Sequence, residues 1–461
     1  MTQLKPAHNQ SGSLLGTVSR ARPFGGRRRD LGRIRSQAVR TIVAVDVGAT
    51  KICTIVAESG GPERTRVISH SITPSDGVTK GSVTDVSRAE TAIRRSVSAA
   101  VRKSAMPITP ETPAYVGITG THVSFQDRYD RISWAATKGV ITLDDLINVP
   151  KSIAAASARS GRHVLHALTR TYTLDGQRGI HNPLGMHTTR LEVESHVISA
   201  DPFLVRRLTD AARRSGLVVS ALVFQPVASA AAVLTDEEKD EGVALVDIGG
   251  GTTDLIIFQQ GAVQYTSVLP VGGFQFTNDI CIAFDATFES AEAAKLEHGT
   301  TDVLGTRPEE EVTLSIEGRE WPRTILRRDI AQLMKDRAVE LVRLIRIKMM
   351  ESGIEDTDDF KVVLTGGTAK LPGMESLVRD NLTSDVRIGS PNSRWELPRD
   401  LEEPEYATSV GLVMWAMRNP DASFEDFSKV SGQTEDSAGD EDGSEQSQTP
   451  PRSRLGRLLR I

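Results

Sequence analysis

Two segments in separate halves of the chain place an aspartate, glycines and hydroxyl side chains between β-branched runs. The first is Val45-Asp46-Val47-Gly48-Ala49-Thr50-Lys51. In a strand–turn–strand unit, backbone N–H groups, a hydroxyl and a lysine can surround a phosphate, while the aspartate can hold Mg²⁺ through water. An ordinary hairpin accounts for the same residues, so this segment alone leaves both interpretations open.

The second segment is Asp247-Ile248-Gly249-Gly250-Gly251-Thr252-Thr253-Asp254, and a strand follows it directly. Three consecutive glycines are entropically costly, which indicates a backbone that must approach something closely. The neighbouring hydroxyls and carboxylates suit a phosphate with its metal ion. The segment matches neither GxxxxGK[ST] nor GxGxxG, which disfavours a P-loop or a Rossmann site.

A third segment runs from an apolar strand, Val362–Leu364, into Thr365-Gly366-Gly367 and then a proline-started helix. Two glycines there can lay bare backbone against a flat ring such as adenine. A plain strand-to-helix turn is the alternative.

These segments need α/β elements to position them, and the composition is compatible with such a fold. The chain has 461 residues, 39% hydrophobic and 25% charged, which predicts several subdomains in a soluble globular protein. Its two cysteines are too few for a disulfide framework and suggest a reducing compartment. The sequence contains neither a run of 18 apolar residues nor a signal-peptide core, so we expect a cytoplasmic body.

The periodicity predicts short strands from Thr41 onward, followed by helices at 86–102, 201–215 and 226–234. A long helix with one buried stripe is expected from Leu326 onward. Between Ser82 and Ser199 the pattern is less regular and is typical of an inserted α+β subdomain.

The two ends of the chain have a different composition. Residues 1–40 hold nine basic residues against Asp30 and predict a disordered basic arm. Residues 419–449 hold nine acidic residues against Lys429 and predict a self-repelling linker. Residues 450–461 combine four arginines with leucines that share one helical face, which indicates an amphipathic helix; a frayed basic tail is the alternative.

Two Asp-Gly hairpins with a third Gly-Gly turn resemble the spacing of the actin, Hsp70 and sugar-kinase superfamily. Within that superfamily the chain most resembles the bacterial cell-division FtsA family. The resemblance rests on segments spread over residues 41–418: Gly77–Asp85, Val116–Val123, Asp175–Gln177, Asn182–Met186, Arg190–Glu192, His196–Ile198, Pro226–Ser229, Pro270–Gly273, Thr277–Ile280, Ala291–Lys295 and Arg337.

The resemblance implies an α/β, actin-like two-domain ATPase fold with an inserted 1C-type α+β (SHS2-like) subdomain. The expected divisions are 1–40, basic arm; 41–81, first part of subdomain 1A; 82–199, subdomain 1C; 200–241, 1A continued; 242–357, subdomains 2A and 2B; 358–418, a closing 2A/1A segment with the adenosine motif; 419–449, acidic linker; and 450–461, membrane-targeting helix.

The resemblance also implies ATP and Mg²⁺ as ligands. The metal ion would lie near Asp46 and Asp247, through water. Lys295 and Glu292 would reach the ribose or base, although surface charges of a helix are the plain alternative. The nucleotide-binding residues implied in this way are Asp46, Gly48, Thr50, Lys51, Asp247, Gly249, Gly250, Gly251, Thr252, Thr253, Glu292, Lys295, Gly366 and Gly367.

The sequence departs from the family pattern at two places that concern hydrolysis. Ala49 stands where the family often has a hydroxyl. Ala230, Ala231 and Ala232 fill a stretch where efficient actin-fold ATPases place a polar side chain near the attacking water. With no obvious base we assign no catalytic residue and expect at most a slow ATPase.

The partners implied are the C-terminal tail of FtsZ, further copies of the chain in filaments, an anionic membrane surface, and other division proteins through subdomain 1C; nucleic acid is not expected. Arg323, Arg327 and Arg328 are the candidate contacts for FtsZ. Membrane contacts are assigned to Arg454, Leu455, Arg457, Leu458 and Leu459.

The sequence therefore predicts an ATP-binding scaffold that polymerises and tethers FtsZ filaments to the cytoplasmic face of the cell membrane at the division site. Two alternatives stay open. One is a PilM-like docking adaptor for an envelope assembly, which would not need the terminal helix. The other is an actin-fold kinase or ATPase, which would need a polar catalytic group.

Overall fold

The fold is taken from a computed structural model. It describes residues 39–60, 65–104, 109, 112–132, 139–158, 160–358, 360–392, 395–420 and 422, all of which belong to one compact unit. None of the helices formed by these residues is long and apolar enough to cross a membrane. The expected basic arm up to residue 38, the linker from residue 423 and the terminal helix lie outside the described residues.

The first sheet has five strands in the order β11-β6-β1-β2-β3. Consecutive β-branched runs form the antiparallel pairs β1–β2 and β2–β3, whereas β6 and β11 run parallel to β1. The strands are β1 (Arg40–Val47), β2 (Lys51–Ser59), β3 (Thr65–Pro74), β6 (Pro113–Ile118) and β11 (Val218–Phe224).

The second sheet repeats this pattern, in the order β14-β13-β12-β17-β18. Three antiparallel strands are again followed by two parallel ones. The two halves of the chain therefore carry the same strand–turn–strand unit, β1–β2 in one and β12–β13 in the other. The strands are β12 (Val243–Ile248), β13 (Thr253–Gln259), β14 (Ala262–Leu269), β17 (Val362–Thr365) and β18 (Val386–Ile388).

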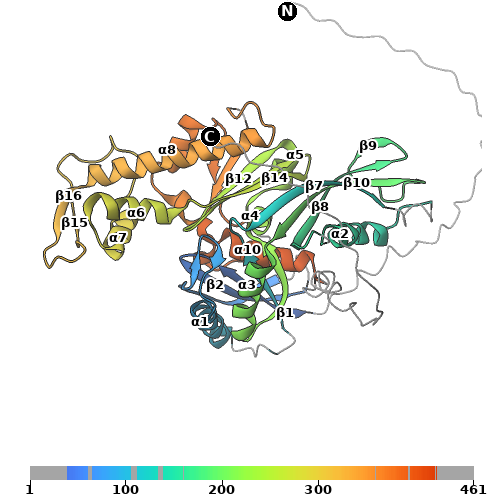
Figure 1. The fold of residues 1–461 in the computed structure, drawn as a ribbon, viewed down its shortest axis with the longest axis horizontal. Coiled ribbons are helices and arrows are strands. Elements are labelled where there is room, and N and C mark those ends of the chain that lie inside the picture. The colour runs from blue at the N-terminus through green and yellow to red at the C-terminus, as the bar shows by residue number, and fades with distance from the viewer. Residues whose placement is uncertain are drawn as a thin grey trace, which may run out of the picture. The chain divides into compact units, whose positions relative to one another are not determined.

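Helices α4 (Gln225–Val233) and α10 (Ala407–Arg418) form a layer between the two sheets and share one apolar core with both. Helices α1 (Val86–Ser104) and α3 (Pro202–Arg214) pack side by side on the other face of the first sheet (Figure 1). The α4–α10 layer therefore reaches the ends of both β-hairpins at once.

The inserted unit has its own four-stranded sheet, in the order β7-β10-β8-β9, covered by α2 (Leu143–Ala158). Its strands are β7 (Val123–Ile132), β8 (His163–Leu174), β9 (Gln177–Ile180) and β10 (Leu191–Ala200). The expected range 82–199 begins too early, because α1 and β6 belong to the first sheet: β6 pairs with β1, and α1 buries its apolar face on that sheet. The other expected boundaries remain predictions.

A smaller unit extends from the second sheet and contains the long helix α8, orange in Figure 1. The apolar stripe expected from Leu326 onward is buried along α8. The elements here are α6 (Gly273–Phe284), α7 (Phe288–His298), β15 (Glu311–Leu314), β16 (Arg323–Leu326), α8 (Arg327–Glu351) and α9 (Met374–Asn381). The remaining short elements are β4 (Val78–Thr79), β5 (Ser82–Val83), α5 (Asp236–Glu241), η2 (Gly367–Lys370), η3 (Arg399–Leu401) and η4 (Pro404–Tyr406).

Candidate functional site

The turns of the two equivalent hairpins have the same backbone geometry. In the β1–β2 turn the N–H of Gly48 donates to the carbonyl of Lys51 at 3.1 Å. In the β12–β13 turn the N–H of Gly249 donates to the carbonyl of Thr252 at 2.9 Å. Each turn leaves its central backbone amides outside the ladder of its sheet, where they can serve an external acceptor.

The two turns touch each other. A Cβ placed on Gly250 would lie 2.4 Å from Cγ2 of Thr50, and one on Gly251 would lie 2.8 Å from Cβ of Ala49. Neither glycine can therefore carry a side chain without moving the opposite turn. The triglycine motif is explained by this close approach, because neither glycine has a positive φ.

Asp46 lies next to the last residue of β1, beside this contact, and is held by residues of two helices. Gln225 donates its Nε2 to Oδ1 of Asp46 at 3.1 Å, and Ser409 donates its hydroxyl to Oδ2 at 3.0 Å. Burial, opposed by the Ser409 hydrogen bond, raises the pKa of Asp46 to about 6. The carboxylate is therefore costly to ionise unless a cation approaches it.

Asp247 and Asp254 face each other across the β12–β13 pair and are both buried. Asp247 accepts hydrogen bonds from Ser229 at 2.7 Å and Thr408 at 3.2 Å, and burial raises its pKa. Asp254 accepts one from Thr119 at 2.8 Å. Burial and then the charge of Asp247 raise the pKa of Asp254 well above its ordinary value.

The charge of Lys51 acts on Asp46 and Asp247. Its Nζ lies 3.3 Å from Oε1 of Glu405 and 4.1 Å from the centre of the Tyr406 ring. Among the described residues, no three His, Cys, Asp or Glu side chains converge closely enough to ligate a metal ion directly. The oxygen donors of Asp46 and Asp247 suit a hard divalent cation held through water.

The third glycine turn, at Gly366 and Gly367, contacts the β12–β13 hairpin. A Cβ on Gly366, whose φ is 88°, would meet Oδ1 of Asp247 at 2.4 Å. Thr368 donates its hydroxyl to the carbonyl of Gly249 at 3.0 Å. Gly367 is more open, since its Cβ would meet only Glu405, at 3.7 Å.

Helix α6 begins against the triglycine turn. Lys295 lies on the next helix, α7, and its side chain reaches the start of α6. Gly273 donates its N–H to the carbonyl of Gly249 at 2.9 Å. Lys295, on α7, donates to the carbonyl of Gly273 at 3.2 Å and to Oε2 of Glu292 at 2.7 Å, and both side chains also contact Thr277. The structure thus brings Glu292 and Lys295 to the side of the three turns.

Comparisons with known proteins show the family of the chain. A sequence model of "Cell division protein FtsA" matches residues 244–411, and one of the "SHS2 domain inserted in FTSA" matches residues 120–199. The FtsA of Pseudomonas aeruginosa is 32% identical over 382 residues, which are 83% of this chain and 90% of that protein. The chain belongs to the FtsA family.

Other FtsA proteins are similarly close. Those of Escherichia coli and Bacillus subtilis are each 30% identical to the chain, over 82% of it and over 91% and 83% of their own lengths. Among solved structures, the "PilM-PilN type IV pilus biogenesis complex" matches with a TM-score of 0.55 and 18% identity, covering 82% of this chain and 98% of that one. The fold is therefore the actin-like α/β fold with an SHS2 insert, as expected for an FtsA-family chain.

Two expected contacts differ in the structure. Thr253 donates its hydroxyl to the carbonyl of Val271 at 2.8 Å, so that hydroxyl is committed within the second sheet. Arg327, expected as a free cationic contact on the smaller unit, is bound by both carboxylate oxygens of Glu310 at 2.9 and 3.0 Å. Its Nε also donates to the carbonyl of His298 at 3.0 Å, so Arg327 fastens the start of α8 to the end of α7 and to the residue before β15.

Arg323 and Arg328 are exposed on the smaller unit and lie outside the site. The membrane contacts Arg454, Leu455, Arg457, Leu458 and Leu459 lie outside the described residues.

Sequence reasoning missed the polar residues that the helices contribute. Because alanines follow Pro226, the sequence predicted no polar group from this helix. The first residue of α4, Gln225, nevertheless holds Asp46. Ser229, Thr408 and Ser409 belong to no motif with a charge or glycine signature. A polar residue directly before a proline-started helix was the available signal for Gln225.

Proposed function

We propose that ATP binds between the three turns with Mg²⁺. The backbone of Gly48–Lys51 and the hydroxyl of Thr50 would hold the phosphates from one side, and Gly249–Thr252 would hold them from the other. Gly366 and Gly367 would face the adenine, with Lys295 and Glu292 toward the ribose. The observation that supports the proposal is the contact of Thr50 with Gly250, which brings the two glycine turns face to face.

Mg²⁺ would be held by Asp46 and Asp247 through water, and it would supply positive charge between the phosphates and these carboxylates. The chemistry of the donor set fits such an ion, because both carboxyls have raised pKa values and, among the residues described, Lys51 is the cation whose charge acts on them. Lys51 would contribute its ammonium to the phosphates after leaving Glu405.

We further propose that hydrolysis is slow. Gln225 is a neutral amide and can orient water but cannot accept its proton. Burial, and then the charge of Asp247, raises the pKa of Asp254 well above its ordinary value, which favours the protonated form of this carboxyl. ATP would then act mainly by shifting the population between a more open and a more closed arrangement of the two halves around the three turns.

Within the FtsA family, this nucleotide switch would serve a division scaffold. We propose that the chain polymerises, binds the C-terminal tail of FtsZ through the smaller unit and recruits other division proteins through the SHS2 insert. Residues 450–461 would attach it to anionic lipid on the cytoplasmic face of the membrane at the division site. Arg323 and Arg328 remain the cationic candidates for the FtsZ contact.

The adaptor alternative is less well supported. The likeness to PilM is 18% in sequence and concerns the fold alone, whereas identity to FtsA proteins reaches 32% over most of the chain. An adaptor of that kind also would not need the apolar, arginine-rich residues 450–461.

The test is flotation of the purified full chain with anionic liposomes, with and without FtsZ and with Mg-ATP, Mg-ADP or no nucleotide. We expect FtsZ to float only when the chain is present, and more strongly with ATP. Nucleotide titration on the same preparation separates the two parts. Flotation of FtsZ without measurable ATP binding would refute the nucleotide switch, and ATP binding without FtsZ flotation would refute the tether.

A further inference from the structure

The outer surfaces of α1 and α3 form a basic face on the first sheet. The two helices carry nine basic residues and two acidic ones, in a chain whose net charge is −5. Arg88, Arg95 and Arg102 recur every seven residues and so form one stripe along α1. Arg206 and Arg213 repeat the same spacing on α3. Nothing in the nucleotide site uses this surface.

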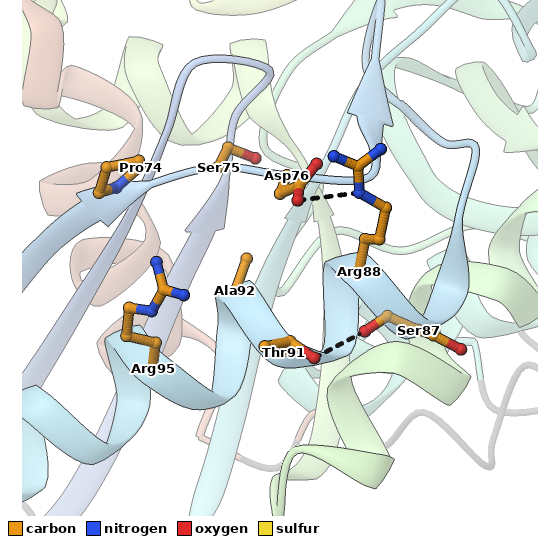
Figure 2. Close-up of a pocket in the computed structure, with 8 residues that line it drawn as sticks. All are labelled: Pro74, Ser75, Asp76, Ser87, Arg88, Thr91, Ala92 and Arg95. Atoms are coloured by element: carbon orange, nitrogen blue, oxygen red, sulfur yellow. Dashed lines mark hydrogen bonds and ion pairs between the residues drawn. The ribbon is translucent and has the colours of Figure 1, made fainter.

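A hollow with a volume of about 420 Å³ opens on the basic face between α1 and the end of β3. Figure 2 shows Arg88 and Arg95 reaching from α1 toward the segment Pro74–Asp76. Arg88 is bound to Asp76 at 2.9 Å. Within the described residues, Arg95 forms no ion pair, and the buried hydroxyl of Ser75 has no hydrogen-bond partner. The hollow is therefore suited to an anionic group.

Among the residues described, the acidic residues on or beside this face form no ion pair with Arg95 or Arg102. Asp76 is paired with Arg88, and Glu90 is paired with Arg94. Asp85 accepts the N–H of Arg88 at the start of α1. Arg95 and Arg102 are exposed and unmatched among the residues described, and their planar guanidinium groups favour carboxylate or phosphate partners.

The chain itself contains a segment of opposite charge. Residues 423–449 hold eight acidic residues and one basic residue, and six of the acidic ones lie between Glu435 and Glu445. We infer that this acidic segment docks on the basic face of its own chain, with carboxylates against Arg95 and Arg102. The contact does not depend on the proposed nucleotide function.

The spacing of the charges is compatible with this contact. Arg88 and Arg102 are fourteen residues apart on α1, or about 21 Å along the helix axis. Asp436 and Asp442 are six residues apart, which spans about 20 Å when the chain is extended. One extended stretch can therefore place a carboxylate near each end of the stripe.

The acidic segment can also reach the face. It starts after Ala422, which packs with α10 on the opposite side of the first sheet. If the fifteen residues after Ala422 behaved as a random coil they would span roughly 20 Å on average, and at full extension about 50 Å, enough to pass around the sheet edge. A tether of this length gives an effective concentration in the millimolar range, which free anions in solution must exceed.

The contact would have a consequence for membrane attachment. An open face with unmatched arginines attracts any anionic surface, at roughly 1 kcal/mol per residue near anionic lipid. With the acidic segment docked, the folded body would be screened and attachment would depend on residues 450–461. Anionic lipid is the competing occupant, and the experiment below separates the two.

The test measures how fast phenylglyoxal modifies individual arginines, read by peptide mass spectrometry on the full chain at low salt. In the test variant, Glu435, Asp436, Asp440, Glu441 and Asp442 are replaced by Gln or Asn. We expect Arg95 and Arg102 to react about three- to tenfold faster than in the unchanged chain. Arg178, exposed on β9 of the insert, should react equally in both proteins and serves as the internal reference.

A matched control separates docking from long-range electrostatics. Glu309, Glu311, Glu317 and Glu320, exposed on the smaller unit, are replaced by Gln, which removes nearly the same charge elsewhere. This control should leave Arg95 and Arg102 as slow as in the unchanged chain. Equal acceleration in both variants, or none in either, would overturn the inference.

Two further readouts decide the occupant. Protection of Arg95 that is independent of protein concentration supports docking within one chain, whereas protection that grows with concentration overturns it in favour of contact between copies. Protection that appears only when phosphatidylglycerol vesicles are added, whether or not the acidic segment is neutralised, assigns the face to lipid and likewise overturns it.

Discussion

Thr50 and Gly250 lie in contact although they belong to different halves of the chain: a Cβ on Gly250 would approach Cγ2 of Thr50 to 2.4 Å. We predict that Gly250→Ala lowers the affinity for Mg-ATP by at least tenfold, because the added methyl group occupies the space between the turns. Isothermal titration of ATP into the folded variant measures the effect.

The control for this substitution is Gly176→Ala, in the exposed β8–β9 turn of the insert. Its backbone has a φ of 93° and no atom lies within 4 Å of a Cβ, so the change costs about 1 kcal/mol of stability through backbone strain alone. ATP affinity should stay unchanged. An equal loss in both variants would mean that general destabilisation, not the turn contact, explains the result.

Asp247→Asn should weaken nucleotide binding only in the presence of Mg²⁺. The amide can still accept the hydrogen bond that Ser229 donates at 2.7 Å, but it brings no negative charge to a metal ion. Titrations of ATP with Mg²⁺ and with EDTA measure the difference. Thr408→Val removes the weaker partner of Asp247, at 3.2 Å, and should preserve the Mg²⁺ effect. If Asp247→Asn keeps the full Mg²⁺ effect, Asp247 does not belong to the metal site.

The glycine turns could be predicted from sequence because strand–turn–strand units and Gly runs are local patterns. Their hydrogen-bond partners could not, since Ser409 reaches Asp46 and Thr408 reaches Asp247 from a helix near the other end of the chain. The same limit applies to Arg327: its positive charge is visible in the sequence, but its pairing with Glu310 depends on the β15–β16 hairpin, which folds these two residues back beside each other. Tertiary contacts decide whether such a side chain is available.

The raised pKa of Asp46 predicts a pH dependence between about pH 4 and 6. Because the folded state holds the proton more tightly than the unfolded chain, this group stabilises the protein fully below its ordinary pKa of 3.8. That contribution is lost as the pH rises through about 6. Without nucleotide, the melting temperature of the unchanged chain should therefore fall, relative to Asp46→Asn, between pH 4.5 and pH 7.

Binding of Mg-ATP should show the opposite trend, since the metal ion favours the ionised carboxylate. Affinity should rise between pH 5 and pH 7 in the unchanged chain and much less in Asp46→Asn. Parallel pH profiles for the two proteins would contradict the assignment of Asp46.

The proposed FtsZ contact can be tested at Arg323 and Arg328, because Arg327 is paired with Glu310. We predict that Arg323→Glu with Arg328→Glu weakens binding of an FtsZ tail peptide severalfold, and more at 50 mM than at 300 mM salt, because both residues are exposed. Fluorescence anisotropy of a labelled peptide measures it. Arg343→Glu, exposed further along α8, provides a control of the same sign. Equal weakening by the control would show that net charge, and not this surface, governs binding.

The last prediction concerns the membrane anchor, which we assign to residues 450–461 and not to the basic arm. Only this terminal segment combines arginines with leucines on one helical face. Complete burial of a leucine yields about 1.5–3 kcal/mol, and interfacial burial is partial, so one copy should bind only marginally. Assembly of many copies along one filament would convert this into stable attachment through avidity.

Leu458→Glu with Leu459→Glu should abolish flotation with anionic liposomes while ATP affinity stays unchanged. The matching deletion on the other side must end at Ala38, because Arg40 begins β1 and donates to the carbonyl of Pro420 at 2.9 Å. Removing residues 1–38 should leave most of the flotation. Since the arm contributes charge without an apolar face, its removal should mainly make flotation less dependent on salt. If this deletion alone releases the chain from liposomes, the arm is the tether and the assignment to residues 450–461 is wrong.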